Sequence, residues 1–207
     1  MYPNSTHRRT LGLVMWTLSI LFLCTNAQAE NEGRFDGRVV VEWLTNDEGD
    51  RDMRLFEQFT YTDPAGKSWH VPEGAIINGA SIPRAFWTLV GPPFVGDYRR
   101  ASVVHDYYCD VRTETWQAVH KMFYHASLTG GVPELQAKIM YAAVRGGGPR
   151  WREVEVRSLE GAVELFIIDL NNSLSEESAL ELEAWIESEN PDVNEIEERV
   201  ESFVTTQ

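Results

Sequence analysis

Two histidines and a cysteine stand at spacings that would bring them together on a pair of helices. His105 and Cys109 are four residues apart and share one face of a predicted helix, while Asp106 lies on the neighbouring face. His120 follows on the next predicted helix, and the turn expected at 110–113 lies midway between the two histidines. In antiparallel helices each histidine would lie about 11 Å from that turn. Since packed helix axes are roughly 8–10 Å apart, the two imidazoles can meet.

This set of residues is compatible with three kinds of site. In a structural site, His105 is a buried residue that hydrogen-bonds to His120 or to a backbone carbonyl. In a hydrolytic site, His105 is a general base that His120 or Asp106 holds in place. In a metal site, His105, Cys109 and His120 bind zinc, and three ligands from two helices leave a coordination position open for catalysis. The sequence leaves these three interpretations open.

A glycine-bearing turn at 78–83 (NGASIP) offers further reactive groups. Ser81 is a candidate nucleophile, and Asn78 or the N–H groups of the turn could bind an oxyanion. The alternative is that Ser81 or Asn78 caps the short helix expected after the turn. A triad of Ser81, His105 and Asp106 is disfavoured, because consecutive helix residues point about 100° apart. The candidate catalytic residues are therefore His105, Asp106, His120, Ser81 and Asn78.

The elements that must position these residues change from strands to helices along the chain. Segments rich in β-branched and aromatic residues predict strands, and apolar residues at helical spacing predict helices. The expected strands are 38–44, 53–62 and 67–71, and the expected helices are 84–90, 97–108 with Asp97 as its N-cap, 113–130 and 133–144. Strands followed by helices predict an α+β fold, in which three to four helices pack on a small antiparallel sheet.

Residues 1–29 have the pattern of a secretory signal peptide. A basic pair at 8–9 precedes an apolar run at 11–24, and the small residues at 27–29 fit a cleavage site. The run of 14 residues is shorter than the roughly 18–20 that span a bilayer, so we expect no membrane span in the mature chain. Export to the periplasm or the medium would leave Cys109 as the only cysteine, which excludes an intramolecular disulfide.

The charge of the chain is concentrated at its C-terminal end. Residues 153–207 hold 16 acidic and two basic side chains and carry the whole net charge of −14. We expect an α+β domain at 30–152 and an acidic, helical extension at 153–207. Helical spacing predicts helices at 175–187 and 192–204, while the apolar segment 159–170 fits a strand or a helix. Their apolar stripes need the main domain or a protein partner to cover them, and so acidic a tail argues against nucleic acid as a partner.

Six sequence blocks appear in the order of a known family. They are 69–72 (WHVP), 78–87 (NGASIPRAFW), 101–107 ending in HDY, 122–124 (MFY), 137–144 (AKIMYAAV) and 148–151 (GPRW). These blocks resemble a bacterial and phage family, domain of unknown function 1353, over about residues 35–152. Members usually carry Asp where this chain has Asn78, and many carry Asp where it has His120. The resemblance implies no activity, because none is assigned to the family.

The layout of His105-Asp106 opposite a polar residue at 120 is also similar to that of secreted phospholipases A2. In those enzymes a His-Asp pair on one helix supplies the base and a calcium ligand, and an Asp on the antiparallel helix orients the histidine. This chain lacks their disulfide framework and glycine-rich calcium loop, and it has His120 in place of the carboxylate. The likeness is therefore one of arrangement alone.

Two hypotheses of function follow. The first is an exported, non-catalytic protein that binds or assembles in the cell envelope and in which the histidine pair is structural. The second is a small hydrolase, zinc-dependent if a metal is bound, that uses the candidate residues on a cell-envelope substrate. An open pocket at the histidines would favour the second hypothesis, and burial of both rings under Trp116 and Phe123 would favour the first.

Overall fold

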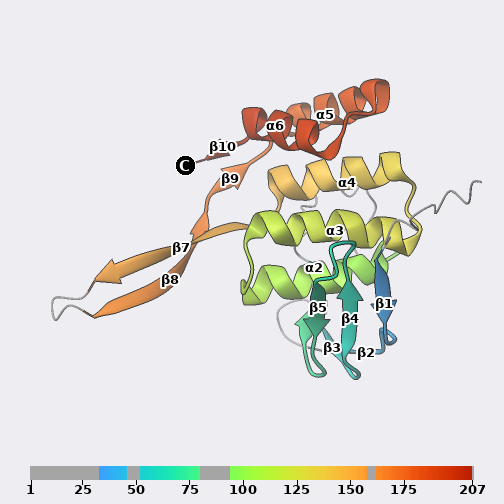
Figure 1. Cartoon of the computed structure of the whole chain (residues 1–207), viewed down its shortest axis with the longest axis vertical. Coiled ribbons are helices and arrows are strands. Elements are labelled where there is room, and N and C mark those ends of the chain that lie inside the picture. Colours follow the sequence, from blue (N-terminus) through green and yellow to red (C-terminus); the bar gives the residue numbers. More distant parts are fainter. Residues whose placement is uncertain (1–32, 46–51, 80–93, 158–161, 207) are drawn as a thin grey trace, which may run out of the picture.

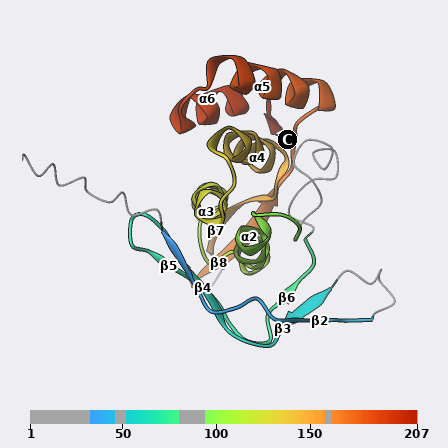
Figure 2. The same ribbon diagram turned by 90° about the vertical axis from the view of Figure 1, so that its right-hand side faces the viewer.

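The chain folds into stacked layers of strands and helices. The structure, a computed structural model, describes residues 33–45, 52–79, 94–157 and 162–206. Short strands form one layer, helices lie on them, and the C-terminal helices lie outermost (Figures 1 and 2). This arrangement confirms the predicted α+β fold. The predicted signal peptide and the helix expected at 84–90 lie outside the described residues. Within the described part of the chain, no helix combines the length and the hydrophobicity needed to cross a bilayer.

The N-terminal layer consists of short antiparallel strands. Their bounds are β1 Arg34–Asp36, β2 Val41–Trp43, β3 Met53–Leu55, β4 Phe59–Thr62, β5 Ser68–Val71 and β6 Ile76–Ile77. They form two small sheets, in the orders β1-β4-β5 and β2-β3-β6. The predicted first hairpin is confirmed as the pair β2–β3, and the predicted third strand is confirmed as β5. The sequence pattern did not indicate β1 and β6.

The single strand predicted at 53–62 is wrong, because the chain bends between β3 and β4. Odd-numbered positions from Met53 to Tyr61 would face inward in one continuous strand, and all of them are buried except Glu57. A carboxylate is costly to bury without compensation. Glu57 therefore stays at the surface, where it pairs with Arg38 at 3.1 Å. The chain changes direction there, and β3 and β4 join different sheets.

Three helices follow the strands: α2 (Arg99–Val111), α3 (Trp116–Gly130) and α4 (Glu134–Gly147). All three are predicted elements with shifted ends. The predicted N-cap of α2 is wrong, since α2 starts after Tyr98 and has no side-chain cap. The backbone of Asp97 instead packs against Gly130 of α3, where a Cβ would lie 2.3 Å from the Asp97 carbonyl oxygen. α2 ends where Arg112 adopts a left-handed conformation, with φ of 55°.

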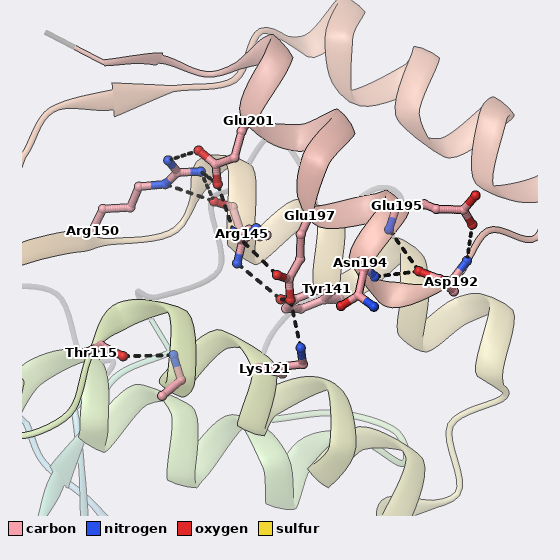
Figure 3. A network of polar contacts seen from close by, with 11 residues as sticks. Thr115, Lys121, Tyr141, Arg145, Arg150, Asp192, Asn194, Glu195, Glu197 and Glu201 are labelled. Atoms are coloured by element: carbon pink, nitrogen blue, oxygen red, sulfur yellow. Dashed lines mark hydrogen bonds and ion pairs between the residues drawn. The ribbon is translucent and has the colours of Figure 1, made fainter.

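The core lies between the sheets and the helices. Side chains from both layers are buried in it, among them Leu55, Phe59, Tyr61, Val104, Val119, Phe123 and Met140. α2 contacts β5 and β6, and α3 lies between α2 and α4 (Figure 2). α3 begins later than predicted, after Thr115, whose hydroxyl accepts a hydrogen bond from the Ala118 N–H (Figure 3). Its central place puts His120 in the interior of the molecule.

The acidic segment folds back onto the domain. Its elements are β7 Arg150–Arg157, β8 Val163–Leu170, β9 Asn172–Ser173, α5 Glu176–Glu189, α6 Val193–Phe203 and β10 Thr205–Thr206. Both predicted tail helices are confirmed as α5 and α6. The segment 159–170, for which strand and helix remained open, contains β8, which pairs with β7 in an antiparallel hairpin. The compositional boundary at 152–153 thus falls inside β7.

The apolar faces of α5 and α6 are buried against α4. Leu182, Ile186, Ile196 and Val200 are at most 2% exposed, and α4 contacts both tail helices. Gly146 of α4 permits close approach of the tail, because a Cβ at that position would lie 2.6 Å from the side chain of Leu174, which precedes α5, and 3.4 Å from that of Val200 of α6. The main domain therefore covers the apolar stripes of the tail.

A network of polar contacts joins α6 to α3 and α4 (Figure 3). Glu197 accepts hydrogen bonds from the Tyr141 hydroxyl at 2.7 Å and from Lys121 Nζ at 3.1 Å. Glu201 pairs with Arg150 at 2.9 Å and with Arg145 at 3.2 Å. Both arginines are buried, so water screens these ion pairs less than it screens pairs on an open surface. The tail is therefore docked by charge as well as by apolar contact.

Candidate functional site

The two histidines meet, as their spacing predicts. α2 and α3 are antiparallel neighbours joined by the short turn at 112–115. His105 Nε2 lies 2.8 Å from His120 Nδ1, and the two ring centroids are 5.0 Å apart. Cys109, one helical turn beyond His105, places its Sγ 3.6 Å from His105 Nε2. The ligand atoms of the predicted zinc set all lie within 4.8 Å of one another.

The hydrogen bonds of the pair define where its protons lie. His120 Nε2 is 3.0 Å from the carbonyl oxygen of Pro149, and because a carbonyl only accepts, this nitrogen carries the proton. In a neutral ring Nδ1 of His120 is then an acceptor, so His105 donates to it from Nε2. The remaining acceptor is His105 Nδ1, which lies 3.9 Å from Cys109 Sγ. The pair thus forms a directed chain from His105 through His120 to Pro149.

Aromatic side chains enclose both rings. His105 is 1% exposed and His120 is fully buried. The Phe123 ring lies 4.8 Å from that of His105, and the Trp116 ring lies 5.7 Å from that of His120. Burial lowers the pKa of both histidines below the ordinary value of 6.5, and the positive charge that His105 would carry lowers that of His120 further. Both rings are therefore neutral near pH 7.

Asp106 faces away from His105 and binds the turn after β6. Its Oδ2 accepts hydrogen bonds from the backbone N–H of Asn78 at 2.7 Å and of Gly79 at 3.0 Å. The carboxylate therefore ties this turn to α2 and does not orient the imidazole, as the geometry of adjacent helix residues predicts. Asn78 joins the site through its backbone. Ser81, the candidate nucleophile, lies outside the described residues.

A cavity of about 320 Å³ opens beside the cluster. It is lined by Ile76, Asn78, Asp106, Cys109, Asp110, Arg112 and Pro149. Neither histidine is among the described residues that line it. A molecule in this cavity would meet the Cys109 side chain and the Asp106 turn, with the imidazoles behind them.

The acceptor of the His120 proton is the part of the site that sequence reasoning missed. Gly148 allows Pro149 to come close, since a Cβ at 148 would lie 3.1 Å from His120 Cε1 and 2.3 Å from the Val144 carbonyl oxygen. The available signal was the glycine run before Pro149, which indicated the end of a helix. Glycine also permits close backbone approach, and this second property is the one that the site uses.

Two arginines connect the tail to Trp116, which packs against His120. The guanidinium carbons of Arg145 and Arg150 lie 5.1 Å and 4.2 Å from the centroid of the Trp116 ring. The same two side chains bind Glu201 of α6 (Figure 3). Trp116 in turn covers His120. The same two arginines therefore bind the acidic tail and pack against the tryptophan that covers the histidine pair.

Comparisons with known proteins agree with the resemblance seen in the sequence. Residues 53–144 match the model of a family described as Protein of unknown function (DUF1353). The uncharacterized protein y4jT of Sinorhizobium fredii (strain NBRC 101917 / NGR234) is 46% identical over 99 residues, which are 48% of this chain and 30% of that protein. The uncharacterized protein y4iH of the same strain is 38% identical over 104 residues, 50% of this chain and 44% of that protein. No solved structure matches the chain.

The chain thus spans less than half the length of these curated relatives. The histidine pair, Cys109 and the Asp106 turn lie inside the matched segment, whereas Pro149 and the acidic tail lie outside it. The predicted resemblance to the family DUF1353 is confirmed over residues 53–144.

Proposed function

We propose that this protein is an exported, non-catalytic protein that binds or assembles in the cell envelope, with the His105–His120 pair as part of its structure. The burial of both rings carries the proposal, since His105 is 1% exposed and His120 is fully buried. The pair joins α2 to α3, and the bond to Pro149 joins it to the end of α4. Because both histidines are buried and hydrogen-bonded, their contacts determine which residues of α2, α3 and the end of α4 face one another.

The same burial argues against general base catalysis by these histidines. A general base must reach its substrate and must bind a proton near the working pH. Trp116 and Phe123 cover the rings, and burial lowers the pKa of both. Asp106 binds backbone N–H groups and supplies no carboxylate to either ring. The residues of the pair thus have the partners that a structural role requires.

The proposed location rests on residues 1–29, whose pattern is that of a signal peptide. We infer cleavage near Ala29 and a periplasmic or secreted mature chain. In the tail, the apolar faces of α5 and α6 pack on α4, so a protein partner of these helices would meet their exposed acidic side chains, such as Glu177 and Glu187. Such a partner would present basic residues there.

A second candidate, a zinc-dependent hydrolase, is favoured by one distance. In a tetrahedral zinc site, bonds of about 2.0–2.1 Å to nitrogen and about 2.3 Å to sulfur separate a nitrogen and a sulfur ligand by about 3.6 Å, and two nitrogen ligands by about 3.3 Å. Cys109 Sγ and His105 Nε2 fit this at 3.6 Å, and Cys109 borders the cavity. The histidine nitrogens, at 2.8 Å, would have to separate by about half an ångström and release the shared proton.

Zinc content separates the two candidates. The chain is expressed from its own leader in a bacterial host, and metal is measured by mass spectrometry in the purified protein and in a Cys109→Ala variant. Under the proposal zinc is far below one per chain, and Cys109→Ala stays folded with a loss of about 1 kcal/mol, because a small side chain leaves a small cavity. One zinc per chain that is lost in a folded Cys109→Ala variant would overturn the structural interpretation and support the hydrolase.

The intact mass of the same preparation tests export. A mature chain that begins at Glu30 and is found outside the cytoplasm supports the proposal. An uncleaved chain that stays in the cytoplasm would refute it.

A further inference from the structure

The hairpin of β7 and β8 projects from the body of the molecule (Figure 1). We call Arg150–Arg157 and Val163–Leu170 together the arm. Large apolar side chains on it are 44% to 60% exposed, namely Val156, Val163, Leu165, Phe166 and Ile167. A two-stranded hairpin by itself is at best marginally stable in water. An arm with this much exposed apolar surface gains stability when a second surface covers it.

One face of the arm carries a self-complementary pattern. Residues that pair across an antiparallel ladder point to the same side, so Val154 and Phe166 form the centre of this face. Arg152 lies two pairs nearer to the body, and Glu164 lies two pairs nearer to the far end, so both are on this face. The aliphatic partners of these two charged residues are Ile168 and Val156, respectively. The face is therefore apolar at its centre, positive toward the body and negative toward the far end.

We propose that this face packs against the same face of a second copy of the chain. A two-fold axis through the Val154–Phe166 pair would run the two arms in opposite directions. Each Phe166 would then lie over the apolar centre of the other arm, and each Arg152 would lie next to Glu164 of the other copy. Both ion pairs form in one arrangement, which is the condition for a closed, isologous dimer. The bodies would lie at opposite ends of the paired arms.

The opposite face of the arm does not suit this arrangement. It presents Glu153 and Glu155 at neighbouring positions along β7, opposite the apolar residues Ile167 and Leu165 of β8, and Val163 lies on the same side. A two-fold axis through the middle of that face would place Glu153 of one copy opposite Glu155 of the other. Like charges in that position repel. The charge pattern therefore selects the face of Phe166 as the one that pairs, and this dimer covers Phe166 and Val156 of the five exposed apolar side chains.

The size of the arm sets the strength of this dimer. Eight residues at about 3.3 Å each give a length of about 26 Å, so one arm face offers much less than the roughly 800 Å² per partner of a stable interface. The dimer is therefore weak and forms at high local concentration, as in a confined envelope compartment. In this respect the inference rests on the proposed assembly function and names its partner.

Sedimentation of the full mature chain over a wide concentration range tests the dimer. The wild type is expected to dimerise, and Arg152→Glu or Glu164→Arg alone should weaken dimerisation about ten-fold, since each reversal turns two attractions into repulsions. The double variant Arg152→Glu/Glu164→Arg should restore it. Arg157→Glu, an exposed reversal on the opposite face, is the matched control and should change nothing. Circular dichroism checks that each variant is folded.

Each outcome of the sedimentation experiment either supports or overturns the arm dimer. A chain that stays monomeric throughout, or folded single reversals that dimerise like the wild type, would overturn the inference, as would a double variant as weak as its parents. Zinc content is measured on the same samples. A monomeric chain without zinc would refute only the arm dimer, whereas a chain with one zinc lost in Cys109→Ala would refute the structural role of the histidine pair.

Discussion

Acidification should destabilise the fold through the His105–His120 pair. Burial lowers the pKa of His105 to about 3 and that of His120 well below 6.5, while in the unfolded chain both bind a proton below about pH 6.5. In this range the unfolded chain holds more protons than the folded one, so stability decreases as the pH falls. The stabilisation is complete above about pH 6.5 and is lost progressively toward the pKa values of the folded state.

The magnitude follows from linkage. Each histidine that stays neutral in the folded state lowers the free energy of unfolding by about 1.4 kcal/mol for every pH unit below its unfolded pKa. The pair therefore lowers it by about 2.7 kcal/mol per unit. Between about pH 6.5 and about pH 5 the loss is about 3 kcal/mol, because the slope reaches its full value only below the unfolded pKa; this is a large share of the roughly 5–15 kcal/mol that stabilise a domain. Burial raises the pKa of Glu197, but its hydrogen-bond donors and the neighbouring cations together lower it more, so this carboxylate loses its contribution at more acidic pH. The change in stability between about pH 6.5 and about pH 5 therefore reports on histidines.

Urea unfolding followed by tryptophan fluorescence, from about pH 7.5 to about pH 5, measures this dependence. His120→Gln removes one titrating ring and should reduce the slope by about 1.4 kcal/mol per pH unit. His125, whose pKa burial also lowers, is present in both proteins and cancels. His70→Gln, on an exposed position of β5, is the matched control. Equal slopes in the wild type and in His120→Gln would refute the reasoning.

A measurement on the wild type keeps the test decisive if His120→Gln does not fold. Nuclear magnetic resonance of the histidine rings follows protonation directly. The resonances of His105 and His120 should not shift between about pH 7.5 and about pH 5, because both rings remain neutral in the folded protein. Titration of either ring near pH 6.5 would show that it is accessible and would contradict the buried pair.

Three further substitutions test the contacts around the pair. Glu197→Gln should weaken docking of the tail by about 1–3 kcal/mol, since its carboxylate accepts hydrogen bonds from α3 and α4; amide exchange in α5 and α6 should accelerate, while the exposed control Glu198→Gln should not change it. Asp106→Ala should cost about 1–3 kcal/mol in urea unfolding, because two backbone N–H groups lose their acceptor; an unchanged midpoint would contradict that role. Gly148→Ala should cost about 1–3 kcal/mol, because the new Cβ would lie 2.3 Å from a carbonyl oxygen of α4; an unchanged Tm would show that the backbone yields there.

The sequence determined the local elements and the meeting of the histidines. Helix periodicity places His105 and Cys109 on one face, and a turn midway to His120 brings the two rings level when the helices are antiparallel. The structure has this arrangement, with the two nitrogens 2.8 Å apart. Periodicity also predicted α5 and α6, since apolar spacing is a local property of the chain.

Sequence patterns did not determine where inward-facing charges would break an element. The alternation from Met53 to Tyr61 is that of one strand. The bend at Glu57 follows from the burial of the face that Glu57 would occupy, because burying its carboxylate there would be costly. The ambiguity of the segment 159–170 had a similar cause, because an apolar run fits a strand or a helix until its pairing partner, β7, is known.

Only the tertiary structure decided what the candidate site can do. The Pro149 carbonyl that receives the His120 proton lies 29 residues further along the chain, and no local spacing predicts such a contact. The same residues would suit a base, a zinc ligand set or a buried pair, and the choice depends on how much water reaches them. Burial among Trp116 and Phe123 is a property of packing between elements, which a pattern along one chain does not contain.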